Sequence, residues 1–431
     1  MTASLIGFAV ALALCLLRLP IALSLGIVGF AGFGLLIGWE ASLAQVAQVT
    51  TDTALEYGFS VVPLFVLMGN LVTRARLSDE LYAASNAFLG HRRGGLAYAT
   101  IFACGGFSAV SGSSVATAAT MTKVAMPSMR RFGYRDELAV GSIAAGGTLG
   151  ILIPPSIVLV IYGLLTQSSI GKLFAAGFVP GAIAILFYCA AIFVTTRLVP
   201  EAGPPGPRQS WAVRWASLRG VWGILLLFTV VMGGIYLGIF TPTEAAGIGA
   251  VCAFLFVLFR RATNARGLID VLADTAYTTA ALFSVLIGAI LFANFLNSAG
   301  MTQQLAEFVS KLQMSPYAVL WVILLIYIVL GCVFESISMV LLTVPVFFPL
   351  VQSLGFDLIW FGIVVVCVTE LSLITPPVGL NIFVVRGLLP DVPTSTIIRG
   401  LFPFIVADVL RLVLIVHIPW LSLVVPRALF G

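Results

Sequence analysis

The stretch from Gly105 to Tyr162 is apolar enough to lie in a membrane, yet it is rich in residues that an ordinary transmembrane helix avoids. A run of glycines and serines ends at Ser114, and the pair Pro154-Pro155 interrupts the apolar run that follows. An unpaired backbone amide in hydrocarbon costs several kcal/mol, so a broken helix persists at membrane depth only where it is buried in protein or lines a polar cavity. The stretch is therefore a candidate binding site inside a membrane protein.

The composition of the whole chain fits that class. Of its 431 residues, 60% are hydrophobic and only 9% are charged, whereas a soluble globular domain carries about 25% charged residues. Apolar runs of about 20 residues recur along the chain, so we expect an all-α polytopic membrane protein. The N-terminus has no cleavable signal pattern, and the first helix should be retained. The net charge of +5 can serve to orient the protein in the membrane, so we expect no nucleic-acid partner.

Two apolar segments are too long for a single crossing and contain a polar interruption. The segment at about 95–130 should fold about Ser111-Gly112-Ser113, and the segment at about 316–351 about Phe334-Glu335-Ser336. We interpret both as re-entrant hairpins, which leaves about ten transmembrane helices in the lipid bilayer. The positive-inside rule supports this choice, because most arginines then fall on one side, the cytoplasmic side. Both termini are then periplasmic, together with Lys172, Lys311 and Arg427.

An internal repeat relates the two halves of the chain at a spacing of 222 residues. The matched anchors are Pro20 and Pro242, Asp52-Thr53-Ala54 and Asp274-Thr275-Ala276, Pro127 and Pro349, and Pro154-Pro155 and Pro376-Pro377. We predict a first repeat at 1–199, a cytoplasmic linker at 200–218 and a second repeat at 219–431, with broken helices at 137–165 and 357–386. Each half has an odd number of crossings, so the second half is inverted, as in inverted-repeat ion transporters.

The broken helices free backbone groups near the middle of the membrane, because proline removes a donor and blocks a helical hydrogen bond. Half-helix N-termini can face an anionic substrate, and free carbonyls with hydroxyl oxygens can coordinate sodium. The oxygen-rich candidates are Ser111, Gly112, Ser113 and Ser114 in the first half, and Ser336, Ser338 and Thr375 in the second. Such residues also merely pack and kink helices. The recurrence of a hairpin and a Pro-Pro break at one spacing favours a site.

Charged side chains inside apolar segments are costly, and they are usually paired or functional. Glu335, at the second hairpin tip, and Glu370, just before the second Pro-Pro pair, could both face the site. Glu244 follows a helix start, where capping explains it equally well. Asp408 and Arg411 share one helix face, and we interpret them as a structural pair. The cysteines and histidines have no metal-ligand spacing and no residue set resembles a catalytic triad, so we expect no enzyme.

Several motifs resemble the large membrane subunit of TRAP (tripartite ATP-independent periplasmic) transporters, of the DctM type. They are the glycine-serine tip, Gly146–Ser156, Thr241–Ala246 and Glu370–Asn381, and the resemblance covers nearly the whole chain. It implies sodium-coupled import of an organic acid across the bacterial inner membrane by an elevator mechanism. It also implies two partners, a separate small four-helix membrane subunit and a periplasmic substrate-binding protein. The first tip departs from the more distant dicarboxylate/sodium symporters, because it lacks their asparagine.

By this resemblance, sodium is held at the two hairpin tips and the adjoining unwound segments. The sodium-binding positions would be Ser111, Gly112, Ser113 and Gly147 in the first half, and Glu335, Ser336, Thr375 and Pro376 in the second. We expect the substrate to contact Ser114, Pro154, Pro155, Ser156, Ser338, Pro377 and Asn381. Na⁺ is then the coupling ion, with no other cofactor. The substrate stays open among C4-dicarboxylates, sialic acids and 2-oxo acids, because the binding protein largely sets specificity in this family.

Other functions fit the sequence less well. The alternative within transport is a stand-alone sodium/dicarboxylate symporter that needs no binding protein. An ion channel would require an uninterrupted polar pore lining, and an intramembrane enzyme would require a paired nucleophile and base; the sequence shows neither. A membrane scaffold has no need of two hairpins and two Pro-Pro breaks at one repeat distance.

Overall fold

The computed structural model describes residues 2–311, 313–332 and 334–431. Within these ranges the regular structure is helical, and no strand is formed. Seven helices of the described residues are long and apolar enough to cross a membrane, and several shorter apolar helices accompany them. The chain is therefore an all-α polytopic membrane protein, as its composition predicts.

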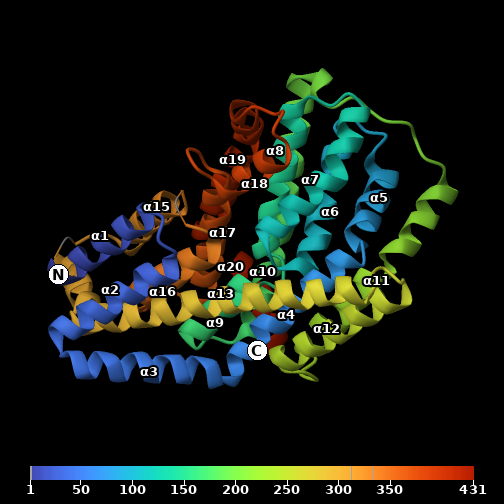
Figure 1. Ribbon diagram of the computed structural model, residues 1–431. Coiled ribbons are helices and arrows are strands. Elements are labelled where there is room, and N and C mark those ends of the chain that lie inside the picture. The colour runs from blue at the N-terminus through green and yellow to red at the C-terminus, as the bar shows by residue number, and fades with distance from the viewer. Residues whose placement is uncertain (1, 312, 333) are drawn as a thin grey trace.

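The helices of the first half end with the broken helix formed by α8 and α9 and the long helix α10 (Figure 1). Their bounds are α1 (Thr2–Leu16), α2 (Ile21–Leu36), α3 (Trp39–Leu55), α4 (Val61–Arg74), α5 (Leu77–Leu89), α6 (Gly95–Ser111), α7 (Ser114–Arg131), α8 (Asp136–Thr148), α9 (Ile157–Thr166) and α10 (Ile170–Leu198). Short 3₁₀ turns lie at Tyr57–Ser60, Leu149–Ile151 and Pro200–Ala202.

The helices of the second half follow a similar order. Their bounds are α11 (Trp211–Tyr236), α12 (Pro242–Phe259), α13 (Ala265–Ser298), α14 (Met301–Lys311), α15 (Pro316–Gly331), α16 (Ser336–Ser353), α17 (Leu358–Ile374), α18 (Leu380–Leu388), α19 (Thr394–His417) and α20 (Trp420–Phe430). Shifting α7 by 222 residues gives the bounds of α16, and the same shift brings α8 onto α17 and α10 onto α19. The repeat read from a few proline anchors therefore extends to the order of the helices.

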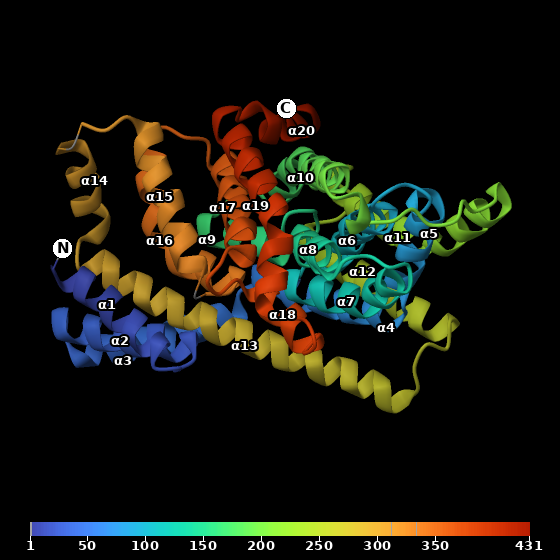
Figure 2. The ribbon, with the colours of Figure 1, turned by 90° about the horizontal axis from the view of Figure 1, so that it is seen from above.

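One difference between the halves is the element that follows the second long segment. The first half has two helices there, α3 and α4, separated by a turn at Glu56, whereas the second half has the single 34-residue helix α13. Helix α13 runs across the whole molecule in both views (Figures 1 and 2). It packs along α2, while α12 packs along α4, its repeat counterpart. These four helices form one framework of close pairs.

Glycines set the close approach of α2 and α13. A Cβ atom on Gly29 would lie 2.6 Å from the carbonyl carbon of Leu291, and one on Gly288 would lie 2.4 Å from the carbonyl oxygen of Ala22. Such distances are far below van der Waals contact, so only glycine allows these backbones to touch. The same device joins α8 to α19, where a Cβ on Gly141 would lie 2.3 Å from the carbonyl oxygen of Gly400.

Helix starts follow ordinary capping chemistry. Thr241 and Glu244 form a reciprocal capping box at α12, so Glu244 caps a helix, which was one of the two explanations that the sequence allowed. Ser210 accepts a hydrogen bond from the N–H of Val213 and starts α11 at Trp211, inside the linker expected at 200–218. The early start has a tertiary cause, because buried Arg214 donates to the carbonyl of Ala87 at 3.1 Å.

An exposed ion-pair cluster ties the two repeats at the arginine-rich side. Arg130, near the end of α7, contacts Asp136 of α8 at 3.2 Å and Asp391, between α18 and α19, at 2.5 Å. Hydrogen bonds from Arg130 lower the pKa of the Asp391 carboxyl. Because all three side chains are more than a third exposed, the cluster contributes little to stability.

Candidate functional site

The first hairpin tip is the connection between α6 and α7. Gly112 ends α6 with φ of 60°, a left-handed conformation that glycine adopts without strain. Ser113 then begins α7, and its hydroxyl accepts a hydrogen bond from the N–H of Ala116 at 3.3 Å. The hydroxyl of Ser111 lies 2.8 Å from that of Thr117. The tip is therefore a tight turn in which most oxygens already have local partners.

The second tip lies between α15 and α16. Glu335 is the N-cap residue of α16, and Ser336 is its first residue. The hydroxyl of Ser338 donates to the carboxylate of Glu335 at 3.2 Å, which holds this acid over the helix start. Val333 lies outside the described residues, so the tip is described from Phe334 onward.

The two tips face one cavity of about 280 Å³. Four of the predicted sodium positions line it, together with Ser114, which was predicted to contact the substrate; the four are Ser111, Gly112, Ser113 and Ser336, and Glu335 adds a fifth. Helices α7 and α16 both begin at this cavity, at Ser114 and Ser336. Two helix N-termini therefore direct partial positive charge at the same space, which favours a bound carboxylate.

Both broken helices lie behind the tips rather than in the cavity lining. Between α8 and α9 the chain is unwound from Leu152 to Ser156, and between α17 and α18 from Thr375 to Gly379. A Cβ on Gly147 would lie 2.8 Å from Ala118 Cβ, and one on Gly112 would lie 3.3 Å from the carbonyl oxygen of Pro155. The first break is thus pressed against the first tip.

The remaining predicted positions have structural partners outside the cavity lining. Ser156 caps α9 and its hydroxyl donates to the carbonyl of Ile151 at 2.5 Å. Thr375 donates to the carbonyl of Leu371 at 2.6 Å. None of Gly147, Pro154, Pro155, Ser156, Ser338, Thr375, Pro376, Pro377 and Asn381 lines the tip cavity. The structure therefore brings together the tip residues of the two halves and places the break residues around them.

Asn381 joins the two halves of the chain. Its side-chain nitrogen donates to the carbonyl of Ala144 in α8 at 2.9 Å, and its oxygen accepts from the hydroxyl of Ser114 at 3.0 Å. Asn381 is fully buried and Ser114 nearly so. One amide at the start of α18 thus fixes the first tip and the first broken helix relative to the second broken helix.

Sequence reasoning missed the other wall of the cavity. Helix α4 contributes Asn70 and Thr73, and α13 contributes Thr278. Asn70 donates to the hydroxyl of Thr275 in α13 at 2.9 Å, and a Cβ on Gly69 would lie 3.0 Å from the carbonyl oxygen of Ser111. The pair Gly69-Asn70 inside an apolar helix was the one signal in the sequence that could have indicated this wall.

A second cavity meets the tip cavity at Asn70 and Thr73, which line both. It has a volume of about 480 Å³, and its other charged residues are Arg74, Arg76, Lys123, Asp270 and Asp274. The tip cavity therefore continues toward the arginine-rich side of the molecule.

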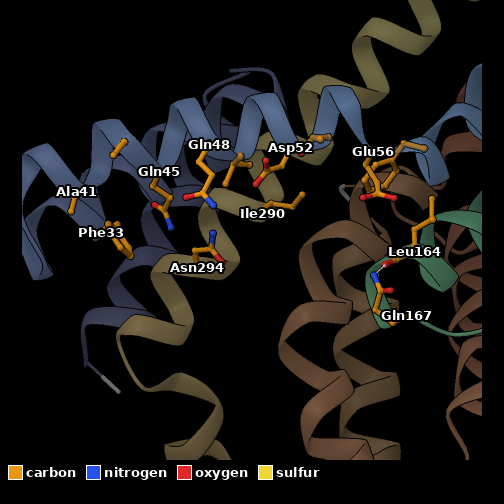
Figure 3. Close-up of a pocket in the computed structure, with 14 residues that line it drawn as sticks. Phe33, Ala41, Gln45, Gln48, Asp52, Glu56, Leu164, Gln167, Ile290 and Asn294 are labelled. Atoms are coloured by element: carbon orange, nitrogen blue, oxygen red, sulfur yellow. Dashed lines mark hydrogen bonds between the residues drawn. The ribbon is translucent and has the colours of Figure 1, made fainter.

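A larger hollow of about 740 Å³ lies elsewhere, against α3 (Figure 3). In Figure 3, Gln45 and Gln48 reach from α3 toward Asn294 of α13, with Asp52 and Glu56 farther along the helix. It contains neither hairpin-tip residues nor residues of the helix breaks. We assign the functional site to the smaller tip cavity, because there the two repeats supply equivalent residues.

Glu370 was expected to be able to face the site, and the structure places it elsewhere. Its carboxylate lies 2.6 Å from the guanidinium of Arg411, which also contacts Asp408 at 2.9 Å. The predicted pair of Asp408 and Arg411 is therefore present, with Glu370 as a third member. Among the described residues no group of three or more histidine, cysteine or acidic side chains could hold a metal ion.

Comparison with known proteins gives a consistent family. The family described as "Tripartite ATP-independent periplasmic transporter, DctM component" matches residues 8–421. The C4-dicarboxylate TRAP transporter large permease protein DctM of Pseudomonas aeruginosa is 38% identical over 388 residues, 90% of each chain. The sialic acid TRAP transporter large permease protein SiaM of Vibrio cholerae is 32% identical over 373 residues, 86% of this chain. In fold, the chain is similar to the crystal structure of the Alcanivorax borkumensis YdaH transporter, with a TM-score of 0.63 at 16% identity over 98% of this chain and 99% of that one.

Proposed function

Because this chain belongs to the family of TRAP transporter large permease subunits, we propose that it imports an organic acid together with sodium ions across the bacterial inner membrane. Its relatives are transporter subunits and not enzymes. The proposed partners are a small four-helix membrane subunit and a periplasmic protein that delivers the substrate. C4-dicarboxylate and sialic acid appear in the names of relatives, so a carboxylate is the substrate class we propose.

The observation that carries the proposal is the cavity between the two hairpin tips. Ser111, Ser113 and Ser336 bring hydroxyl oxygens to it, and α7 and α16 begin there. Hydroxyl and carbonyl oxygens suit a hard cation such as sodium, and helix N-termini suit a carboxylate. We therefore assign sodium to the two tips and the substrate to the space between them.

The connection of this cavity to the arginine-rich hollow supports an inward-facing conformation. By the positive-inside rule Arg74 and Arg76 lie on the cytoplasmic side, which places both termini in the periplasm. A substrate released from the tips then enters a basic vestibule, where Lys123 also lies. The positive potential of these side chains favours departure of an anion toward the cytoplasm.

We propose that transport proceeds by an elevator movement. The moving part, called the transport unit here, comprises the hairpins and the broken helices, α6–α9 and α15–α18; the scaffold comprises α2, α4, α12 and α13. Close glycine contacts lock α2 to α13 in the scaffold. Polar contacts such as that of Asn381 with Ser114 hold the transport unit together. A unit bound internally in this way can slide as one body while its site stays intact.

Uptake by proteoliposomes tests the proposal. Purified permease with its small subunit is reconstituted, and the binding protein loaded with labelled substrate is added outside. We expect uptake only with an inward sodium gradient and with the binding protein, and no stimulation by ATP. Full uptake at negligible sodium under a proton gradient would refute sodium coupling. Full uptake without the binding protein would instead indicate the stand-alone symporter.

A further inference from the structure

Three charged side chains are buried together away from the tip cavity. Glu370 of α17 and Asp408 and Arg411 of α19, called the acid cluster here, have exposed fractions of 0%, 1% and 0%. Arg411 Nη2 lies 2.6 Å from Glu370 Oε2 and 2.9 Å from Asp408 Oδ1. None of the three lines the tip cavity or the vestibule that continues from it. The cluster is therefore packed inside protein.

A hydrogen-bond chain connects the acid cluster to the first repeat. Tyr188 of α10 donates to Asp408 Oδ2 at 2.7 Å, and its hydroxyl lies 3.0 Å from that of Thr148, at the end of α8. Thr148 and Glu370 are 222 residues apart, so they occupy equivalent positions in the two broken helices. The chain thus runs from one broken helix to the other through α10 and α19, which are repeat counterparts.

The charges of the acid cluster do not balance if both acids are ionised. Two carboxylates and one guanidinium leave one negative charge in a fully buried place. The other titratable groups that face the cluster are Tyr188 of α10 and Cys367 of α17, and neither is cationic. Among the described residues, Arg411 is the one basic side chain paired with these acids. A buried charge without a partner is strongly unfavourable, and such a group takes up a proton instead.

We propose that the acid cluster is a proton-binding site that holds one proton at neutral pH, and that the proton resides on Glu370. Asp408 has a partner on each oxygen, Tyr188 on Oδ2 and Arg411 on Oδ1. Glu370 is contacted through Oε2 alone, and no hydrogen bond from a described residue reaches Oε1. Asp408 is therefore the better-stabilised anion of the two.

The bound proton has a consequence for transport that rests on the proposed elevator. Helix α19 packs along both α8 and α17, so the acid cluster moves with the transport unit. A net charge inside that unit would be acted on by the membrane potential at every crossing. With one proton bound the cluster is neutral, so the potential acts on the sodium ions and the substrate and not on the cluster.

Infrared spectroscopy of the full chain in lipid tests the proton directly. A protonated carboxyl group has a carbonyl stretch that is separate from the carboxylate bands. We expect this band in the difference between wild type and Glu370→Gln at neutral pH, whether or not the protein is transporting. Absence of the band from that difference would refute a proton on Glu370, regardless of whether sodium-coupled transport is correct.

Stability and uptake give a second test. Glutamine has the shape of a protonated glutamic acid, so Glu370→Gln should fold and keep uptake within about twofold of wild type. Asp408→Asn removes the ionised acid and should reduce uptake far more. Folded wild type holds a proton that unfolded Glu370 has lost, so its stability should fall as pH rises from neutral, and the Glu370→Gln variant should lack this slope. A Glu370→Gln variant that fails to fold while Asp408→Asn folds would overturn the assignment.

Discussion

The hydrogen bond between Ser114 and Asn381 offers a quantitative test of how the two repeats are joined. Ser114→Ala removes the donor and leaves a buried amide oxygen unsatisfied, which should lower the free energy of unfolding by about 1–3 kcal/mol. Asn381→Ala removes this bond and the bond to Ala144, and it also leaves a small void. Its cost should be larger, about 2–4 kcal/mol.

The double variant separates the bond from its surroundings. After either single substitution the shared hydrogen bond is already lost, so the double variant should lose less than the two single losses together, by about 1 kcal/mol. The assay is denaturant unfolding of the purified protein in mixed micelles. As a matched control, Asn294→Ala on α13 lies at the α3 hollow and should combine additively with Ser114→Ala. Additive losses for Ser114 and Asn381, within about 0.5 kcal/mol, would refute the contact.

Three further outcomes follow from the same account. A cysteine placed at Ser210 should resist a membrane-impermeant reagent in intact cells while one placed at Gly431 is labelled; the opposite pattern would overturn the topology and the inverted repeat. Gly112→Ala should lower the free energy of unfolding by about 1 kcal/mol, because alanine strains the left-handed turn that ends α6; an unchanged unfolding midpoint would contradict this. A cross-link between cysteines placed at Thr278 and Ile337, which face one cavity from the scaffold and from the second tip, should abolish uptake but spare sodium binding. Uptake that survives the link would refute the elevator.

Local chemistry explains why so much of the fold could be predicted from the sequence. Pro154-Pro155 and Pro376-Pro377 break helices wherever they occur, and a glycine flanked by serines, as at Gly112, suits a turn. The repeat spacing then places the two hairpins and the two breaks at equivalent points. These features depend on neighbours in sequence, so they are visible without a structure.

Tertiary pairing explains the rest. The partner of Glu370 is Arg411, one helix away in space, and no local pattern indicates that the two meet. Asn70, Thr73 and Thr278 are single polar residues in apolar helices, and such residues often only pack. Asn381 was expected at the substrate, but its role here is to bridge Ser114 and Ala144. Which polar residues face a cavity is thus decided by helix packing.

The central claim is that the tips of the two hairpins hold the coupling sodium. The structure indicates the cleaner variant for testing it. Ser113 caps α7, so Ser113→Ala also costs about 1 kcal/mol of helix stability. Ser336 lines the cavity without being a helix cap, because Glu335 holds that position. Ser336→Ala therefore removes a candidate ligand oxygen with the least effect on folding.

The most direct measurement is the dependence of uptake on external sodium, in proteoliposomes supplied with the binding protein, for wild type and Ser336→Ala. We expect saturable activation by sodium in wild type. In the variant the half-activating concentration should rise about tenfold or more, as for the loss of one interaction of about 1.4 kcal/mol, with assembly unchanged. Identical sodium curves for the two proteins would contradict the assignment of sodium to the second tip, and uptake that is indifferent to sodium in wild type would contradict sodium coupling itself.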